Sequence, residues 1–146
     1  MNILAIDPGT KCGYAMGPAL SGVWNLSIKP GEGAGMRFFR LRNYLVECCR
    51  DVDMVVYEDV ARHLGTQAAH IYGGIVAHIQ EYCEMNHTHY VGVPVKTIKL
   101  FATGKGNADK AAMIAAARER WPEYDLKDDN QVDALWIWAW ATEEYS

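Results

Sequence analysis

Three short apolar runs, each closed by turn residues, open the sequence before any helical pattern appears. They cover residues 2–6, 11–16 and 22–28, and the first run stops at Asp7-Pro8-Gly9. Runs of this length between Gly and Pro boundaries are typical of short strands joined by tight connections. The beginning of the chain is therefore predicted to form an antiparallel three-stranded meander.

Helical and strand-like patterns alternate from there to the end of the chain. Apolar residues at spacings of three and four mark the helical segments, and short continuous apolar runs mark the buried strands. The helical patterns cover residues 36–49, 66–85, 108–119 and 130–143, and the strand-like runs cover residues 52–57 and 90–93. This order predicts an α/β fold whose mixed five-stranded sheet is flanked by helices.

The size and composition of the chain favour a single domain over residues 1–146. Half of the 146 residues are hydrophobic, which is enough for one core and too little for two. No apolar run reaches the roughly 20 residues that span a bilayer, and the ends carry no signal pattern. We expect a cytoplasmic protein without membrane contact, whose four cysteines are reduced because two are adjacent and none has zinc-ligand spacing.

Acidic residues at predicted strand ends are the strongest indication of function. Asp7 and Glu58 each follow an apolar strand, and strands of one sheet bring their ends together. Two neighbouring carboxylates repel each other unless a proton or a divalent cation neutralises them. Asp133 adds a third acid, because it lies inside an apolar helix where a capping role does not explain it. Asp128 or Asp129 is instead expected to cap that helix.

Oxygen ligands without His or Cys favour hard cations, so the acids predict a site for Mg²⁺ or Mn²⁺. Two such ions roughly 4 Å apart suit phosphoryl transfer, because they activate the attacking water and stabilise the leaving oxygen. Asp7 is the expected bridging ligand between them.

A basic segment interrupts an otherwise acidic chain, whose formal net charge is −4. Its lysines are Lys96, Lys99, Lys105 and Lys110. Gly104 and Gly106 allow the backbone to approach a phosphate closely, so we expect this segment to contact DNA phosphates.

Four segments of the sequence resemble the motifs of the RuvC-like Holliday-junction resolvases. The first is Ile-Asp-Pro-Gly-Thr-Lys-Cys-Gly-Tyr-Ala at residues 6–15, and the second is Val-Val-Tyr-Glu-Asp at residues 55–59. The third is the Lys-bearing segment at residues 93–110, and the fourth is Asp-Asn-Gln-Val-Asp-Ala-Leu at residues 129–135. The likeness covers nearly the whole chain in order.

This resemblance implies a ribonuclease H-like fold and a homodimer that resolves Holliday junctions, or other branched DNA, by paired symmetric nicks. It implies a crossover junction endodeoxyribonuclease that uses two Mg²⁺ or Mn²⁺ ions, with water attacking the scissile phosphate. The short chain looks more similar to bacteriophage members than to the longer bacterial ones.

The resemblance also implies roles for individual residues. The implied metal ligands are Asp7, Glu58, Asp133 and Asn130, and the implied DNA contacts are Lys96, Lys99, Lys105, Lys110, Arg62, His63 and Thr10. Lys99 and Lys110 match the positions that stabilise transition-state charge. The helix at residues 66–85 is implied to build the dimer interface, and its predicted apolar stripe consists of Ala69, Tyr72, Gly73, Val76, Ile79 and Cys83.

One position departs from the family pattern. Much of the family has an acid three residues before the last Asp, where this sequence has Asn130. An amide oxygen ligates a hard cation but adds no negative charge. Asp129 is the alternative ligand, and we rank Asp133 above Asn130 and Asn130 above Asp129.

Other readings stay open from the sequence. An inactive junction-binding protein is favoured only by Asn130. A nuclease of the same fold that cuts RNA–DNA hybrids or flaps has the same motifs. A nucleotide-binding domain of the actin and sugar-kinase type shares the Asp-Pro-Gly-Thr loop, but needs two such domains, so no nucleotide cofactor is expected. Three tryptophans, Trp136, Trp138 and Trp140, are predicted to pack the sheet rather than stack on bases, because alternate spacing scatters them around a helix.

Overall fold

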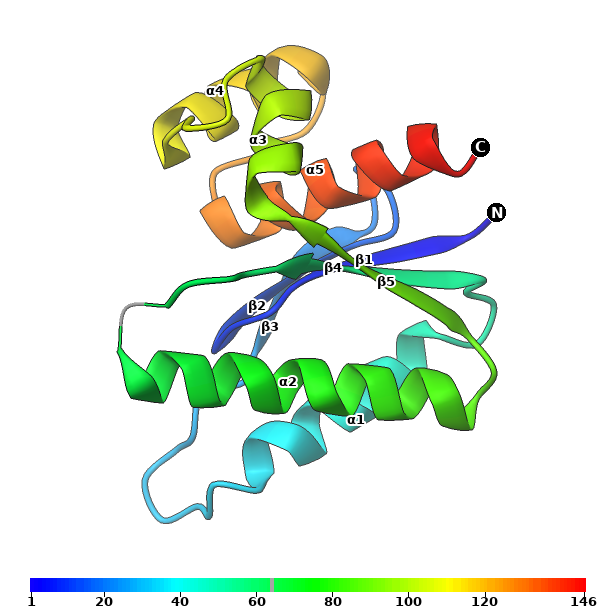
Figure 1. Cartoon of the computed structure of the whole chain (residues 1–146), viewed down its shortest axis with the longest axis vertical. Helices are drawn as coiled ribbons and strands as arrows, with labels where there is room; N and C mark the ends of the chain where they lie inside the picture. Colours follow the sequence, from blue (N-terminus) through cyan, green and yellow to red (C-terminus); the bar gives the residue numbers. More distant parts are fainter. Residues whose placement is uncertain (64) are drawn as a thin grey trace.

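A computed structural model describes residues 1–63 and 65–146, in which a five-stranded sheet lies between two layers of helices (Figure 1). The elements in chain order are β1 Ile3–Asp7, β2 Lys11–Ala15, β3 Ser21–Asn25, α1 Met36–Cys48, β4 Met54–Asp59, α2 Thr66–Met85, β5 His89–Pro94, α3 Val95–Thr103, α4 Lys110–Arg120 and α5 Asp129–Glu144. In the part of the chain that the structure describes, no helix is long and apolar enough to cross a membrane.

The sheet combines antiparallel and parallel pairs, with the strand order β3-β2-β1-β4-β5. β1 to β3 form the predicted antiparallel meander, while β4 runs parallel to both β1 and β5. This confirms the mixed five-stranded sheet expected from the sequence. The register pairs Ile6 with Tyr57, so the next residues, Asp7 and Glu58, lie side by side at the carboxyl ends of the two central strands.

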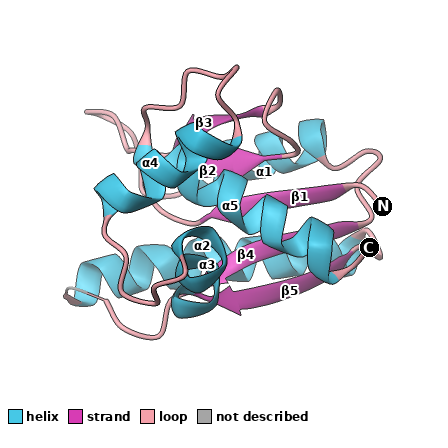
Figure 2. Ribbon diagram, turned by 90° about the horizontal axis from the view of Figure 1, so that it is seen from above, coloured by secondary structure: helices cyan, strands magenta, loops and turns pink. Residues whose placement is uncertain are grey.

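Helices cover both faces of the sheet. Figure 2 shows α5 crossing one face, with α1 and α2 behind the strands. Because side chains alternate along a strand, Leu4 and Ile6 enter the core beneath α1 and α2, while Ile3 and Ala5 enter the core beneath α5. Asp7 continues the second series, so its carboxyl group lies on the α5 face. Glu58 shares that face, because it lies two residues beyond Val56 of the same core.

α5 is the central helix of this second core, and it is buried on nearly all sides. Its first turn is capped by Asp128, whose side chain accepts hydrogen bonds from the backbone of Asn130 and Gln131 at 2.8 and 3.1 Å. The cap is therefore Asp128, one of the two candidates that the sequence left open. The Gln131 side chain donates to Ser21 Oγ at 2.9 Å, which ties the start of α5 to β3.

Gly13 of β2 determines how closely α5 approaches the sheet. A Cβ atom at this position would lie 1.9 Å from the carbonyl oxygen of Asn130. Only a residue without a side chain allows this distance, because two such atoms cannot overlap. The contact brings the first turns of α5 against β2, and therefore next to the end of β1.

α3 is a helix that the sequence patterns did not indicate. It begins directly after Pro94 at the end of β5, and it ends at Gly104, whose φ of 81° is left-handed. The helix has only nine residues and buries only Ile98 among them, so its apolar periodicity is too short to recognise. The Pro and Gly at its borders were the available signals. Two of the predicted phosphate-binding lysines, Lys96 and Lys99, therefore lie on a helix.

The structure adds detail to two packing predictions. Trp136 is buried in the core that includes sheet residues such as Ala5 and Val56, where its ring lies 4.8 Å from that of Trp121 and its Nε1 donates to the carbonyl of Met113 in α4. The buried stripe of α2 consists of Ile75, Ile79 and Cys83, whereas Gly73 is exposed. Apolar periodicity predicts that a helix has a buried face, but which residues are buried depends on the neighbouring elements.

The cysteines agree with the reduced state expected from the sequence. All four are unpaired thiols, and Cys12, Cys49 and Cys83 are buried. Burial raises the pKa of the Cys83 thiol to about 11, and that of Cys49 to about 12. These thiols are thus inert parts of the core.

Candidate active site

Asp7 is a buried acid at the end of β1, with only 9% of its surface exposed. Its pKa is raised well above the ordinary value, first by burial and then by the negative charges of Glu58 and Asp133. Contact with the Glu58 carboxyl group and the charge of Asp129 act in the same direction. Asp7 is therefore surrounded by acids that come from another strand and from a helix.

Glu58 is held in place through its own backbone. Its carbonyl oxygen accepts a hydrogen bond of 2.8 Å from the Tyr72 hydroxyl group of α2, and that hydroxyl accepts a hydrogen bond of 3.0 Å from the Val60 N–H. The Tyr72 hydroxyl therefore bridges two residues of the strand end. This role could not be predicted from the sequence, in which Tyr72 is one member of an apolar stripe.

Asp133 completes the acidic group from α5. Burial raises its pKa to about 7, and the charges of Glu58 and Asp129 contribute in the same direction. Lys99 and Lys110 act in the opposite direction and lower it. The three acids that the sequence proposed are thus brought together from β1, β4 and α5, with two lysines close by.

Asp129 and Asn130 occupy different environments at the start of α5. Asp129 forms an ion pair with Lys110 at 3.3 Å, in which the Lys110 side chain is 83% exposed. Asn130 is half-buried, and its carbonyl oxygen lies against Gly13. Both residues border the acids, but Asp129 already has a cationic partner.

The acids fit a hard divalent cation by their chemistry. In residues 1–63 and 65–146, no three acidic, imidazole or thiol side chains converge tightly enough to form a closed metal site. The pKa values of Asp7 and Asp133 are nevertheless raised, first by burial and then by the other acids, so the carboxyl groups are within electrostatic reach of one another. Ionised carboxylates this close repel each other, and a bound divalent cation relieves that repulsion. An oxygen-only set of this kind suits Mg²⁺ or Mn²⁺.

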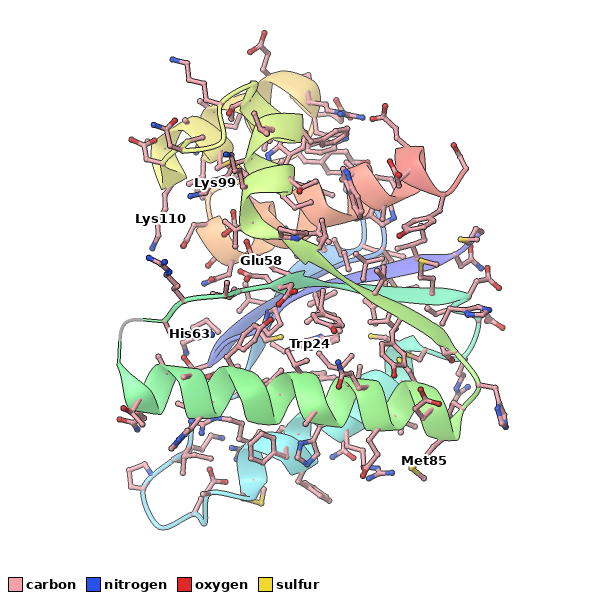
Figure 3. All side chains as sticks on the ribbon, viewed as in Figure 1. Trp24, Glu58, His63, Met85, Lys99 and Lys110 are labelled. Carbon is pink, nitrogen blue, oxygen red and sulfur yellow. The ribbon has the colours of Figure 1, made fainter. Side chains whose placement is uncertain are left out.

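A cavity of about 380 Å³ joins the acids to the basic helices, and we call it the acidic cavity. Its lining residues are Glu58, Val95, Lys99, Ala108, Asp109, Lys110, Met113 and Asp133. Figure 3 shows Lys99 and Lys110 on the α3 and α4 side of Glu58, with His63 on the α2 side. Three acidic side chains, from Glu58, Asp109 and Asp133, and two ammonium groups thus line one space that a phosphate group can enter.

The other predicted lysines lie elsewhere. Lys96 is exposed, and its aliphatic stem packs over Gly106, where an added Cβ would lie 2.9 Å from Lys96 Cγ. Lys105 is exposed beside Thr103, whose hydroxyl group accepts its backbone N–H at 3.1 Å. Neither residue lines the acidic cavity. We therefore call Lys99 and Lys110 the inner lysines, and Lys96 and Lys105 the outer lysines.

A second cavity, of about 490 Å³, opens between the loops that follow Asp7 and Glu58, and we call it the loop cavity. Its lining residues are Pro8, Gly9, Thr10, Val60, His63, Gln67, Ala68, Ile71 and Tyr72. Two predicted DNA contacts, Thr10 and His63, belong to this lining, whereas Arg62 is exposed outside it. Gln67 and Tyr72 were missed, because they join the site only through the packing of α2.

The same fold occurs in solved structures of RuvC from Thermus thermophilus. T. thermophilus RuvC in complex with a Holliday junction substrate is similar with a TM-score of 0.76 and 20% identity, over 94% of this chain and 90% of that chain. A second T. thermophilus RuvC structure is similar with a TM-score of 0.75 and 17% identity, over 99% of this chain and 97% of that one. No family model and no curated protein matches the sequence. The chain has the RuvC-like form of the ribonuclease H-like fold.

Proposed function

We propose that this chain is a single-domain, metal-dependent endonuclease that resolves Holliday junctions and cuts related branched DNA. The observation that carries the proposal is that Glu58 and Asp133 line the acidic cavity together with Lys99 and Lys110, while Asp7 lies within electrostatic reach of both acids. The fold supports it, because one of the similar structures is RuvC in complex with a Holliday junction substrate.

Asp7, Glu58 and Asp133 are the proposed ligands of two Mg²⁺ or Mn²⁺ ions. Asn130 is the better candidate for the fourth ligand, because it lies three residues before Asp133, at the position where the resemblance implies a metal ligand. When bound, such ions supply Lewis acidity and positive charge at the reacting phosphate. The buried position of Asp7 keeps bulk water away from its carboxylate, which favours tight binding of a cation.

Lys99 and Lys110 are the proposed electrostatic partners of the scissile phosphate. Both line the acidic cavity, and an ammonium group there stabilises the negative charge that develops when a water molecule attacks the phosphate. Lys110 leaves the exposed pair with Asp129 at little cost, because surface ion pairs are worth only about 0–1 kcal/mol. The outer residues Lys96, Lys105 and Arg62 then contact the flanking backbone.

Paired nicks require two active sites, and a homodimer supplies them. The exposed side of α2 around Gly73 is the proposed contact between the two copies, since a glycine lets helices approach closely. The resemblance of the motifs also supports a bacteriophage-type resolvase that acts in the bacterial cytoplasm.

An inactive junction-binding protein is the second candidate, and Asn130 favours it because an amide contributes no charge to the metal site. Binding without cutting separates it from the nuclease. Hydrolysis of a nucleotide would instead favour the actin-like alternative.

The deciding experiment incubates the protein with labelled four-way junction, flap and linear duplex in Mg²⁺, Mn²⁺ or EDTA. We expect symmetric, metal-dependent nicks in opposing junction strands, and loss of at least a hundredfold in cleavage for Asp7→Asn with junction binding kept. Glu123→Gln, an exposed acid far along the chain from the strand ends, is the matched control and should cut normally. Equal cleavage by Asp7→Asn would refute the assignment of the metal site.

A further inference from the structure

An ion pair joins the start of α4 to the start of α5 beside the acidic cavity. It links Lys110 Nζ to Asp129 Oδ2 at 3.3 Å. We propose that these two residues exchange partners when DNA binds. The scissile phosphate takes the ammonium group of Lys110, and the released carboxylate of Asp129 supplies the metal site with the negative charge that Asn130 lacks. The inference rests on the metal and DNA sites of the proposed function, and it adds a coupling between the two.

The ion pair lies where a phosphate can compete for it. Lys110 lines the acidic cavity together with Glu58 and Asp133, and its side chain is 83% exposed. A phosphate that enters this cavity therefore meets an ammonium group that already has an anionic partner. Hydrogen bonds between an ammonium group and a phosphate are short and strong, whereas exposed ion pairs contribute little to stability. The exchange of one anion for the other therefore costs little free energy.

The carboxylate of Asp129 acts on the acids of the site. The pKa of Asp7 and that of Asp133 are raised first by burial and by Glu58, and the charge of Asp129 raises both further. A negative charge that hinders the ionisation of these two acids also attracts a cation bound between them, because both effects are Coulomb interactions over the same distance. While Lys110 is bonded to Asp129, its positive charge offsets this attraction. Transfer of Lys110 to a phosphate therefore strengthens cation binding.

Asn130 explains why the site needs another charge. The carboxylates of Asp7, Glu58 and Asp133 bring negative charge to the proposed ions, but the amide oxygen of Asn130 binds a hard cation without adding any. Asp129 is the adjacent residue and is half-buried. Its carboxylate is therefore placed to make up for the missing acid.

Asp128, the other acid at this end of α5, is already used by the helix. Its carboxylate accepts hydrogen bonds from the backbone N–H groups of Asn130 and Gln131 at 2.8 and 3.1 Å. Asp129 has instead an exposed cation as its partner. The two neighbouring acids thus have different roles, because one caps the helix and the other can change its partner.

The exchange makes metal binding and DNA binding depend on each other. If contact between a phosphate and Lys110 strengthens cation binding, a bound cation strengthens DNA binding by the same factor, because the two effects are one coupling free energy. The metal site then reaches its full affinity only where a phosphate lies in the acidic cavity.

The coupling is measured as the factor by which Ca²⁺ tightens the binding of a fluorescent four-way junction, and we call this factor the calcium gain. Ca²⁺ takes oxygen ligands as Mg²⁺ does, and gel electrophoresis identifies conditions in which the junction stays uncut. In EDTA, Asp129→Asn should bind the junction severalfold more tightly than the unmodified protein, because Lys110 is then free. The calcium gain of this variant should be about fivefold smaller.

Two variants separate the exchange from the simple loss of a charge. Asp128→Asn removes a carboxylate one residue away, and an asparagine still caps the helix, so this variant should keep the calcium gain of the unmodified protein. Asp129→Glu keeps a carboxylate beside Lys110 and should also keep the gain. An unchanged gain in Asp129→Asn, or an equal loss in Asp128→Asn, would overturn the exchange.

Calorimetry with Mn²⁺ on the protein alone gives an arm without DNA. The double variant Asp129→Asn/Asn130→Asp keeps the net charge but moves the carboxylate from the partner of Lys110 to the proposed ligand position. We expect it to bind Mn²⁺ about fivefold more tightly than the unmodified protein. Equal affinities would mean that Lys110 does not offset a charge that the metal site needs, and would count against the proposal.

These binding measurements do not require cleavage, so the two proposals can fail separately. If the unmodified protein shows a calcium gain that depends on Asp129 but cuts no branched DNA, the nuclease proposal fails and the exchange stands. If it cuts junctions and Asp129→Asn keeps the whole gain, only the exchange is wrong. If it binds no junction, both are wrong.

Discussion

Asp7 and Asp133 are costly to keep ionised without a cation. Asp7 is buried at the end of β1, and the pKa of Asp133 is raised to about 7 by burial and by Glu58 and Asp129. Stability lost to such repulsion is typical of sites built for binding rather than for folding. The same arrangement makes the protein sensitive to both pH and divalent cations.

The stability of the metal-free protein should fall as pH rises from about 4 to about 7. Asp133 loses its proton near pH 4 when unfolded but keeps it until about pH 7 when folded. The folded state binds more protons in this window, so stability decreases with pH there and levels off above it.

Thermal unfolding in EDTA measures this effect. We expect the midpoint to fall on the order of 5 °C between pH 5 and pH 8, and Asp133→Asn to flatten the curve. Mn²⁺ should raise the midpoint most above pH 7. A midpoint that rises over this window would contradict the raised pKa of Asp133 in the folded protein.

Contacts between elements decide where the acids meet. α5 reaches the strand ends because Gly13 of β2 leaves room for the carbonyl of Asn130, and Gln131 ties the helix to Ser21. α2 contributes Tyr72, which bridges Glu58 and Val60. Each connection joins elements that are distant in sequence, and each determines the position of one proposed ligand.

Gly13→Ala should separate α5 from β2. The added methyl group would overlap the Asn130 carbonyl at 1.9 Å, so we expect a loss of about 1–3 kcal/mol in the free energy of unfolding and a large loss of cleavage. Urea unfolding gives the first value. Gly33→Ala is the control, because nothing lies within 4 Å of that position; equal stability of the two variants would disprove the close approach.

Tyr72→Phe should weaken metal binding without removing a proposed ligand. The Glu58 carbonyl and the Val60 N–H lose their shared partner, at a cost of about 1 kcal/mol in stability. The Mn²⁺ concentration for half-maximal cleavage should rise severalfold. Tyr90→Phe, which removes a hydroxyl bonded to Glu84 at 2.7 Å, is the matched control; if both variants need the same Mn²⁺ concentration, Tyr72 has no positioning role.

The molecule as a whole is acidic, with a formal net charge of −4, so its attraction to DNA must be local. The inner lysines Lys99 and Lys110 border the acidic cavity. The two faces of the sheet have different roles. On one face α1 and α2 complete a core. On the other face α3, α4 and α5 complete the second core, and α3 and α4 carry Lys99 and Lys110.

Lys110→Ala should lower the salt dependence of junction binding. One lost phosphate contact reduces the slope of log affinity against log salt by about 0.9, as measured by titration in EDTA at several salt concentrations. Arg50→Ala, an exposed cation just before β4, should leave the slope unchanged. An unchanged slope for Lys110→Ala would place Lys110 outside the DNA contact.

The sequence alone determined the features that depend on neighbours along the chain. Turn residues and apolar periodicity predicted the meander, the later strands and all helices except α3, whose nine residues are too few for a clear pattern. Acids at strand ends likewise marked Asp7 and Glu58, because the end of a strand is a local property.

Only the tertiary structure decided which side chains meet. Lys99 and Lys110 line the acidic cavity while Lys96 and Lys105 do not, although all four belong to one basic segment. The Trp136 indole N–H donates to the Met113 carbonyl of α4, and the Tyr72 hydroxyl bonds to the end of β4. These outcomes depend on the distance and angle between packed elements, which are set by contacts such as Gly13 against Asn130. Residues far apart in sequence make those contacts, so no local sequence pattern predicts them.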